Sequence, residues 1–298
     1  MGAVEATACY RELGADLRRM RESAGMTGTD LAERTARDRT RLSRIESGTM
    51  RVGEAEIVQY AVTCGLRSSQ AMAMAARREL AERSAAGYWM SDKPDDSLRS
   101  LMFHESTATA VTYYDPVVVN GLLQTADYAR SIISRETWRD AADVEEFVQI
   151  RLSRQHVLYR PNPAAFTFFA PEEVLRRQIG DGLIMHEQLL QMVLVSALPQ
   201  VCVRVVPSIG EDLAAFGNAF QVLTFEKHRP LVYLDIHTTG LFLEDKIKVG
   251  AYRQLVPAIA DAALDERESR EFLAELASEY DRGSAPDAGT DNLEEEQL

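Results

Sequence analysis

The sequence predicts a multi-domain chain, with an all-α amino-terminal domain of five helices and a larger α/β or α+β domain with a mixed sheet. Two observations lead to this fold class. Residues 1–87 carry short amphipathic segments that end in glycine, whereas beyond Pro163 the apolar pattern changes to short runs typical of strands. A length of 298 residues allows two domains, and a hydrophobic content of 46% supports packed cores.

The helices of the amino-terminal domain are predicted from apolar spacing and from the glycines that follow them. Residues 13–20 repeat their apolar side chains at helical spacing, and Gly25 ends this first helix. Residues 57–62 supply a fourth helix, which Gly65 closes. A longer helix rich in alanine and methionine is expected over 67–86, where it either links the domains or pairs with a second subunit.

The second and third helices form the most informative pattern in the chain. Thr27 is a plausible N-cap of the second helix, and Asp38 of the third. Leu42 and Ile45, three residues apart, share one face of the third helix, and Gly48 can adopt the left-handed conformation that stops it. Two short helices joined by a tight turn make a helix-turn-helix, whose second helix enters the major groove of DNA.

The outer face of that third helix is rich in arginine. With the apolar pair turned inward, Arg39, Thr40, Arg41 and Arg44 lie on or beside the opposite face. Arginine can form two parallel hydrogen bonds to guanine O6 and N7, and it binds phosphates equally well. The alternative is an arginine-rich helix face that merely meets solvent. Because the caps, the turn, the inward apolar residues and the outward arginines agree in register, we expect contact with double-stranded DNA.

The charge distribution fits this expectation although the net charge is −13. Residues 11–53 hold ten arginines and seven acidic residues, a local charge of +3, so the rest of the chain carries −16. The acidic remainder should repel the duplex and orient its approach to the amino-terminal domain. Non-specific affinity should therefore be weak and strongly dependent on salt.

These residues resemble the Xre and phage-repressor family of helix-turn-helix proteins. The resemblance implies that Arg39 and Thr40, at the start of the recognition helix, and Arg44, one turn later, contact bases, with Arg41 beside them. It implies phosphate contacts from four further residues, which are Thr27, Gly28, Arg37 and Arg51.

The same resemblance assigns Arg21 and Glu46 to an internal ion pair, which makes Glu46 structural and not a catalytic acid. Two positions depart from the family pattern. Gly28 replaces a frequent glutamine, which removes a potential DNA contact. Ala36 replaces a glycine in the turn, so a non-glycine residue is expected in a left-handed conformation, at a cost of roughly 1 kcal/mol or more.

The second domain is expected over residues 88–280, followed by a disordered acidic tail over 281–298. Its helices and strands alternate without an internal repeat. Helices are predicted at 97–109, 122–133, 143–159, 171–180, 183–198, 245–259 and 265–280, and strands at 111–119, 164–170, 201–207, 218–226 and 230–239.

The segment Gly121-Leu122-Leu123-Gln124-Thr125 stands out in this domain. Gly121 permits a sharp turn from strand to helix, and the two leucines are expected to be buried. Gln124 and Thr125, at the start of a helix, can hold an anionic or polar group. The alternative is a well-formed helix start that only packs against the core.

This segment, with Tyr128 and Ala129, resembles a signature of a large group of actinobacterial regulators that includes WhiJ-like and antitoxin-like proteins. Asp115 and Asn120 depart from the usual form of that signature. The resemblance implies a DNA-binding repressor whose carboxy-terminal domain receives a signal from a small protein encoded by an adjacent gene. Two alternatives remain open, a domain that senses a small-molecule ligand and an enzyme that carries a DNA-binding domain.

Enzyme and metal motifs are weak. His186-Glu187 lacks the second histidine that a zinc protease motif needs, because Leu190 stands at that position. Asp235 and His237 lie two apart on one strand, which is more typical of a strand end reaching solvent. We therefore predict no catalytic residue, no metal and no cofactor.

The cysteines and the apolar runs indicate the compartment, and the size of the DNA-binding motif indicates the assembly. The cysteines Cys9, Cys64 and Cys202 are distant from one another, which indicates reduced thiols. No apolar run reaches the roughly 20 residues that span a membrane, and no secretory signal is visible. A cytoplasmic, nucleoid-associated protein is expected. One helix-turn-helix covers few base pairs, so a homodimer on two half-sites about 34 Å apart is predicted.

Overall fold

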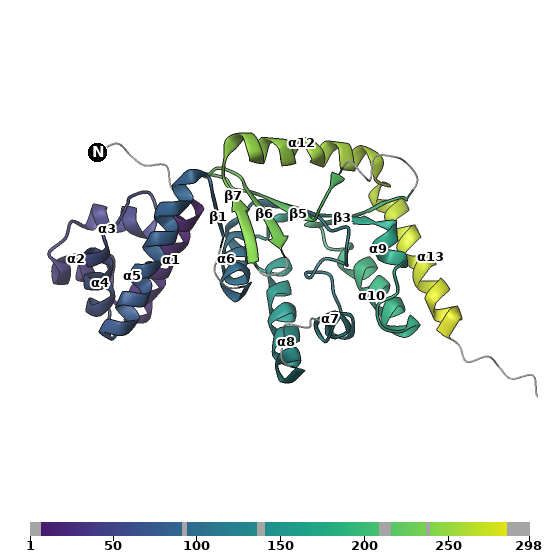
Figure 1. The fold of residues 1–298 in the computed structure, drawn as a ribbon, viewed down its shortest axis with the longest axis horizontal. Helices are drawn as coiled ribbons and strands as arrows, with labels where there is room; N and C mark the ends of the chain where they lie inside the picture. The colour runs from purple at the N-terminus through teal and green to yellow at the C-terminus, as the bar shows by residue number, and fades with distance from the viewer. Residues whose placement is uncertain (1–6, 91–93, 136–140, 209–215, 237–238, 285–298) are drawn as a thin grey trace, which may run out of the picture. The chain divides into compact units, whose positions relative to one another are not determined.

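A computed structural model describes residues 7–90, 94–135, 141–208, 216–236 and 239–284 (Figure 1). The helix-turn-helix region comes first along the chain, and a domain with a mixed sheet and helices follows it. Within the described residues no helix is long and apolar enough to cross a membrane.

The amino-terminal region is all-helical, as predicted. Its helices are α1 (Ala8–Ser23), α2 (Gly28–Thr35), α3 (Arg39–Glu46), α4 (Glu54–Thr63) and α5 (Ser68–Arg83). The predicted stops are confirmed, because Gly25, Gly48 and Gly65 follow α1, α3 and α4 with φ values of 68°, 71° and 92°. Such values favour glycine, which has no Cβ to clash.

The core of this bundle includes apolar side chains from its first three helices. Leu13 and Leu17 of α1, Leu31 of α2, and Leu42 and Ile45 of α3 are all buried. A close approach of α1 to the end of α3 completes the packing: a Cβ atom placed on the glycine at position 14 would lie 2.4 Å from the carbonyl oxygen of Ile45. Helix α3 is therefore seated directly on α1.

The sheet has seven strands within the described residues, in the order β1-β7-β6-β5-β2-β3-β4. The strands are β1 (Tyr88–Met90), β2 (Ala110–Tyr114), β3 (Ala165–Pro171), β4 (Val201–Val206), β5 (Phe220–Thr224), β6 (Leu231–Ile236) and β7 (Thr239–Leu243). Strands β3 and β4 are parallel, whereas β5, β6, β7 and β1 pair antiparallel in turn. The predicted mixed sheet is confirmed, and β1 and β7 are strands that the sequence analysis did not predict.

The helices that accompany the sheet are α6 (Pro94–Thr107), α7 (Ala126–Ile133), α8 (Val144–Arg154), α9 (Glu172–Arg176), α10 (Gly182–Val195), α12 (Lys246–Ala262) and α13 (Glu266–Ser284). The structure corrects several predicted boundaries. The helix predicted over 171–180 ends at Arg176, and the one predicted over 143–159 ends at Arg154 and continues as a 3-10 turn. The strand expected over 111–119 ends at Tyr114, and the helix expected from Leu122 begins at Ala126. Helix α13 runs to Ser284, so residues 281–284 are helical rather than part of a tail. Residues 285–298 lie outside the described part.

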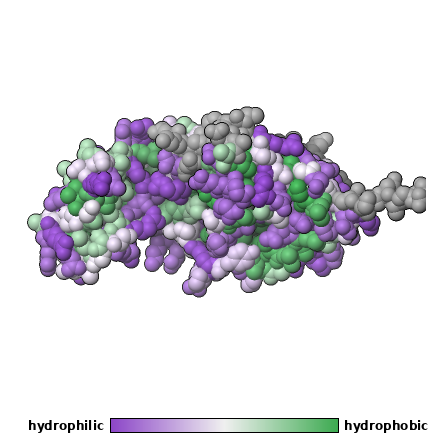
Figure 2. Space-filling view, turned by 90° about the horizontal axis from the view of Figure 1, so that it is seen from below, coloured by the Kyte–Doolittle hydropathy of each residue, from purple (hydrophilic) through white to green (hydrophobic). Residues whose placement is uncertain are grey.

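Contacts within the chain define two compact units. One comprises residues 1–112 and 219–258, and it contains the five-helix bundle with β1, β5, β6 and β7. The other comprises residues 113–218 and 259–298, and it contains β3, β4 and α7 to α10 together with α13. The face shown in Figure 2 is mostly hydrophilic with scattered hydrophobic patches, in keeping with a charged content of 27%.

Candidate nucleic-acid interface

The turn between α2 and α3 has the geometry that the sequence predicted. Ala36 ends α2 in the left-handed conformation, with φ 52° and ψ 42°. Thr27 caps α2 by accepting a hydrogen bond from the Asp30 N–H, and the Asp30 carboxylate accepts one from the Thr27 N–H in return. Asp38 caps α3 by accepting a hydrogen bond from the Arg41 N–H at 2.9 Å. Both helix starts are thus fixed by their own side chains.

Helix α3 divides into a buried and an exposed face. Leu42 and Ile45 are each 2% exposed and pack into the bundle. Arg39, Thr40 and Arg44 are exposed. Among the described residues, nothing forms a hydrogen bond or an ion pair with the side chain of Arg39 or Arg44. These two guanidinium groups are therefore available to an external partner.

Arg41, predicted beside them as a base contact, is placed differently. Its Nε donates to Glu56 Oε1 at 2.8 Å and its Nη2 donates to Glu56 Oε2 at 2.7 Å, so the two side chains form a bidentate ion pair between α3 and α4. This pairing raises the pKa of Arg41 through the hydrogen bonds from its guanidinium to Glu56. One edge of its guanidinium is thus used within the protein.

The four residues predicted to contact phosphate lie around the same helix pair, and three of them have intramolecular partners. The exposed Thr27 hydroxyl donates to Asp30 at 2.6 Å. Arg37 donates to Gln59 Oε1 at 3.3 Å, and Arg51 lies 3.5 Å from Glu82. At Gly28 an added Cβ would meet nothing within 4 Å, so the space beside its Cα is open. The exposed positions suit phosphate contacts, but each arginine would exchange a protein partner for DNA.

The structure brings Arg21 and Glu46 together, as the resemblance implied. Arg21 Nε and Nη2 donate to the two carboxylate oxygens of Glu46 at 2.7 and 2.9 Å, and the Tyr60 hydroxyl donates to Glu46 at 2.8 Å. Burial opposes ionisation of Glu46, but the hydrogen bonds from Arg21 and Tyr60 outweigh it and hold the pKa of Glu46 below its ordinary value. The pair joins the end of α1 to the end of α3.

The Gly121–Thr125 segment lies before α7 and not inside it, which corrects the predicted helix start. Gly121 does not adopt the left-handed conformation, so it is not required by backbone strain. Leu122, Leu123 and Gln124 are buried, and Thr125 caps α7 by accepting a hydrogen bond from the Tyr128 N–H. The segment is an irregular turn with three buried residues at its centre.

A network of amide and arginine side chains fixes this turn. The sequence analysis singled out Gln124 in the segment but did not predict the hydrogen bonds that hold it. Gln188 of α10 accepts a hydrogen bond from the Thr125 N–H and donates one to the Leu123 carbonyl, both at 2.8 Å. Gln155 donates to the carbonyls of Gly121 and Gln124 at 3.1 and 2.7 Å. Arg151 donates to Gln124 Oε1 at 2.9 Å. The polar atoms of the segment are used within the protein, which favours a packing role.

The other titratable candidates form no recognisable centre. His186 Nδ1 lies 2.8 Å from the Ala277 carbonyl, so it joins α10 to α13. Asp235 is at the end of β6, while His237 lies outside the described residues. In the described part of the chain, no group of three or more histidine, cysteine or acidic side chains could hold a metal ion.

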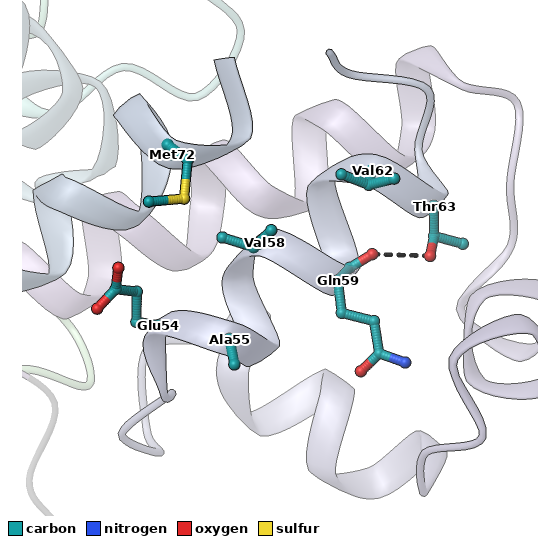
Figure 3. A pocket seen from close by; sticks show the side chains of 7 residues that line it. All are labelled: Glu54, Ala55, Val58, Gln59, Val62, Thr63 and Met72. Carbon is teal, nitrogen blue, oxygen red and sulfur yellow. Dashed lines mark hydrogen bonds between the residues drawn. The ribbon is translucent and has the colours of Figure 1, made fainter. Parts of the chain in front are cut away.

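A shallow pocket lies on the outer side of α4 and α5 (Figure 3). Its lining residues are Glu54, Ala55, Val58, Gln59, Val62, Thr63 and Met72. The one hydrogen bond drawn there joins the Thr63 hydroxyl to the Gln59 carbonyl at 2.7 Å, within one helix. No set of polar groups converges on the pocket, so α3 is the stronger candidate site.

Comparison with known protein families agrees with this placement. Residues 12–73 match a helix-turn-helix domain, which covers most of α1, all of α2 to α4 and the start of α5. Residues 98–275 match a family described as a domain of unknown function (DUF5753). No curated protein and no solved structure matches the chain. Because the second match spans more than half of the 298 residues, the chain belongs to the DUF5753 family, and it carries a helix-turn-helix domain before the family's domain.

Proposed function

We propose that this protein is a sequence-specific DNA-binding regulator of transcription, in which α3 enters the major groove. The observation that carries the proposal is the exposed pair Arg39 and Arg44, whose guanidinium groups have no partner among the described residues. They stand on a helix whose opposite face is buried and whose start is capped. A rigid helix with free bidentate donors is suited to reading guanine in the major groove.

The regulatory part of the proposal rests on the resemblance to actinobacterial regulators. The protein acts as a repressor, as a homodimer on two half-sites, and a small protein encoded by an adjacent gene binds the carboxy-terminal domain to control it. Such a partner must bind the DNA-competent and incompetent arrangements with different affinities, since otherwise no equilibrium shifts. Light scattering at working concentration tests the dimer, and a monomer would contradict it.

The direct test is selection of bound fragments from genomic DNA by the purified full chain. The parent protein should enrich a small set of fragments over random competitor at moderate salt. Arg39→Ala and Arg44→Ala should each lower the affinity for an enriched fragment by about 1–3 kcal/mol, because each removes a base contact.

The matched control for this test is Arg267→Ala, since Arg267 is an exposed arginine on α13 in the other unit. This variant should bind an enriched fragment as the parent does. If the parent enriches no fragment, with or without the product of the adjacent gene, the proposal is wrong. If Arg39→Ala and Arg44→Ala both bind as the parent does, α3 is not the reading helix.

One observation favours a second candidate, a regulator that senses a small anionic molecule. A cavity of about 470 Å³ has the cations Arg229, Lys246 and Arg253 in its wall, together with Glu244. Glu244 also accepts a hydrogen bond from the Ala8 N–H at 2.8 Å, at the start of α1. A ligand in this cavity would lie beside Glu244, which bonds to the first residue of α1, and α1 is the helix that packs against α3. Release of a bound compound on denaturation, detected by mass spectrometry, would favour this candidate.

A further inference from the structure

The Glu56 carboxylate lies on α4 and faces the recognition helix. Glu56 is 8% exposed, and both of its oxygens accept hydrogen bonds from Arg41, at 2.8 and 2.7 Å. The remaining Arg41 nitrogen, Nη1, lies 3.2 Å from the sulfur of Met50. The ion pair therefore occupies the edge of the guanidinium formed by Nε and Nη2, so Arg41 can offer an external partner only the edge formed by Nη1 and Nη2, whose Nη1 already contacts Met50.

The same carboxylate faces a second arginine of the interface. Arg37, in the turn before α3, has its Nη1 atom 3.9 Å from Glu56 Oε1. Hydrogen bonding from Arg41 holds the pKa of Glu56 below its ordinary value, although burial opposes this, and the positive charges of Arg41 and Arg37 add to the lowering. Glu56 is therefore ionised at neutral pH and partly neutralises both arginines. Arg39 and Arg44, by contrast, have no acidic partner among the described residues.

We propose that Glu56 is a specificity-determining residue, which holds Arg41 and restrains Arg37 so that the interface contacts phosphate with fewer free cations. The inference rests on the proposed function and explains how a residue within the domain limits non-specific binding. Each free cation that neutralises a phosphate adds affinity for any sequence, since it releases counterions. Withholding Arg41 lowers this sequence-independent affinity and leaves the base contacts of Arg39 and Arg44 to select the site. The ratio of specific to non-specific binding rises as a result.

The first test is Glu56→Gln in the full chain, with a labelled random-sequence duplex about three helical turns long as the probe. Glutamine keeps the shape and loses the charge, so Arg41 becomes free to bind phosphate. A plot of log affinity against log salt should become steeper by about 0.9. The ratio of variant to parent affinity should fall roughly three- to fourfold between about 50 and 200 mM salt.

The matched control is Glu79→Gln, which removes the same charge from an exposed ion pair with Arg83 on α5. This variant should leave the salt slope unchanged. Equal steepening in both variants would overturn the proposal, since the effect would then be one of net charge. No steepening in a folded Glu56→Gln protein would also overturn it.

The second test does not depend on how Glu56→Gln folds, because it alters only arginines at the surface of α3. On the random-sequence duplex, Arg41→Gln should leave the salt slope almost unchanged, whereas Arg39→Gln should make it shallower by about 0.9, because Arg39 meets phosphates there instead of its target bases. Equal losses in these two variants would overturn the proposal. A parent protein that selects no genomic fragment would refute the proposed function itself. A parent that selects fragments but shows equal slopes in the two variants would refute only the role of Glu56.

Discussion

Helix α3 and the turn at residues 121–125 before α7 use their polar side chains in opposite ways. Helix α3 has a capped start, and the turn leads into the capped start of α7. Both segments carry a motif that the sequence analysis singled out. On α3, Arg39 and Arg44 point into solvent without a partner among the described residues. In the turn, Gln124 is buried and bonded to the Val119 carbonyl and to Arg151.

The difference separates a surface that can bind from a segment that holds the fold. A donor exposed to water can exchange its hydrogen bonds for those of a ligand at little net cost, whereas a buried and satisfied amide cannot leave its partners without exposing their unmet groups. A specific motif is therefore not by itself a binding site. The availability of its donors decides which of the two it is.

The largest loss of stability should come from breaking the ion pair of Arg21 and Glu46 in the helix-turn-helix domain. Like the polar side chains of the turn, this pair is largely buried and bonded within the protein. The side chains of Arg21 and Glu46 are 10% and 11% exposed. Arg21→Ala would leave the Glu46 carboxylate with the Tyr60 hydroxyl alone. We expect a loss of about 3–5 kcal/mol in the stability of α1 to α5, measured by amide hydrogen exchange of these helices.

The control for this prediction is Arg18→Ala, which breaks the exposed pair between Arg18 and Glu22 on the same helix. It should change the stability of α1 to α5 by at most about 1 kcal/mol. Similar losses in the two variants would show that burial does not distinguish these pairs.

The next effect should come from Gln188, the residue of α10 that holds the turn. Gln188→Ala would remove the acceptor of the Thr125 N–H and the donor to the Leu123 carbonyl, and it would leave a gap in the core. We expect a loss of about 2–4 kcal/mol in the stability of α7 and α10, measured by hydrogen exchange.

The affinity of Gln188→Ala for random duplex should stay at the parent value. The matched variant is Gln149→Ala, because Gln149 is an exposed amide on α8 whose side chain bonds, among the described residues, to Glu145 of the same helix alone. It should lose less than about 0.5 kcal/mol. If Gln188→Ala proved as harmless, the turn would not depend on its amide network, and a binding role for the segment would regain weight.

What the sequence could predict follows from how local the cause is. The starts of the two short helices are fixed by the caps Thr27 and Asp38, each of which bonds to a backbone N–H three residues later. The ion pair of Arg41 could not be read from α3 alone, since Glu56 stands fifteen residues later on another helix. For this reason the pattern placed Arg41 with the free arginines.

The second region shows the same limit on a larger scale. The hydrogen bonds between this turn and Arg151, Gln155 and Gln188 join residues 27 to 65 positions apart, so the sequence does not show which side chains meet. The strand predicted over 111–119 ends early because Asp115 and Pro116 follow Tyr114, and proline cannot donate to a sheet. The three residues of β1 form a strand only because β7 pairs with them.

The smallest effect should come from removing one helix cap in each region, because both caps accept a hydrogen bond from a first-turn N–H. Thr125 accepts a hydrogen bond from the Tyr128 N–H at 3.3 Å, and Asp38 accepts one from the Arg41 N–H at 2.9 Å. Thr125→Ala and Asp38→Ala should each destabilise the helix that follows by about 1 kcal/mol, because each leaves a first-turn N–H without its side-chain acceptor. Hydrogen exchange of α7 and α3 measures both losses.

Only the cap on α3 should also affect DNA. Asp38 is an exposed acid at the start of α3, so Asp38→Ala removes a negative charge that repels the phosphates of the duplex and should raise affinity for random duplex. Thr125→Ala should leave that affinity unchanged. If both variants altered DNA binding alike, the turn before α7 would be coupled to the reading helix, and the separation between a binding surface and a structural turn would not hold.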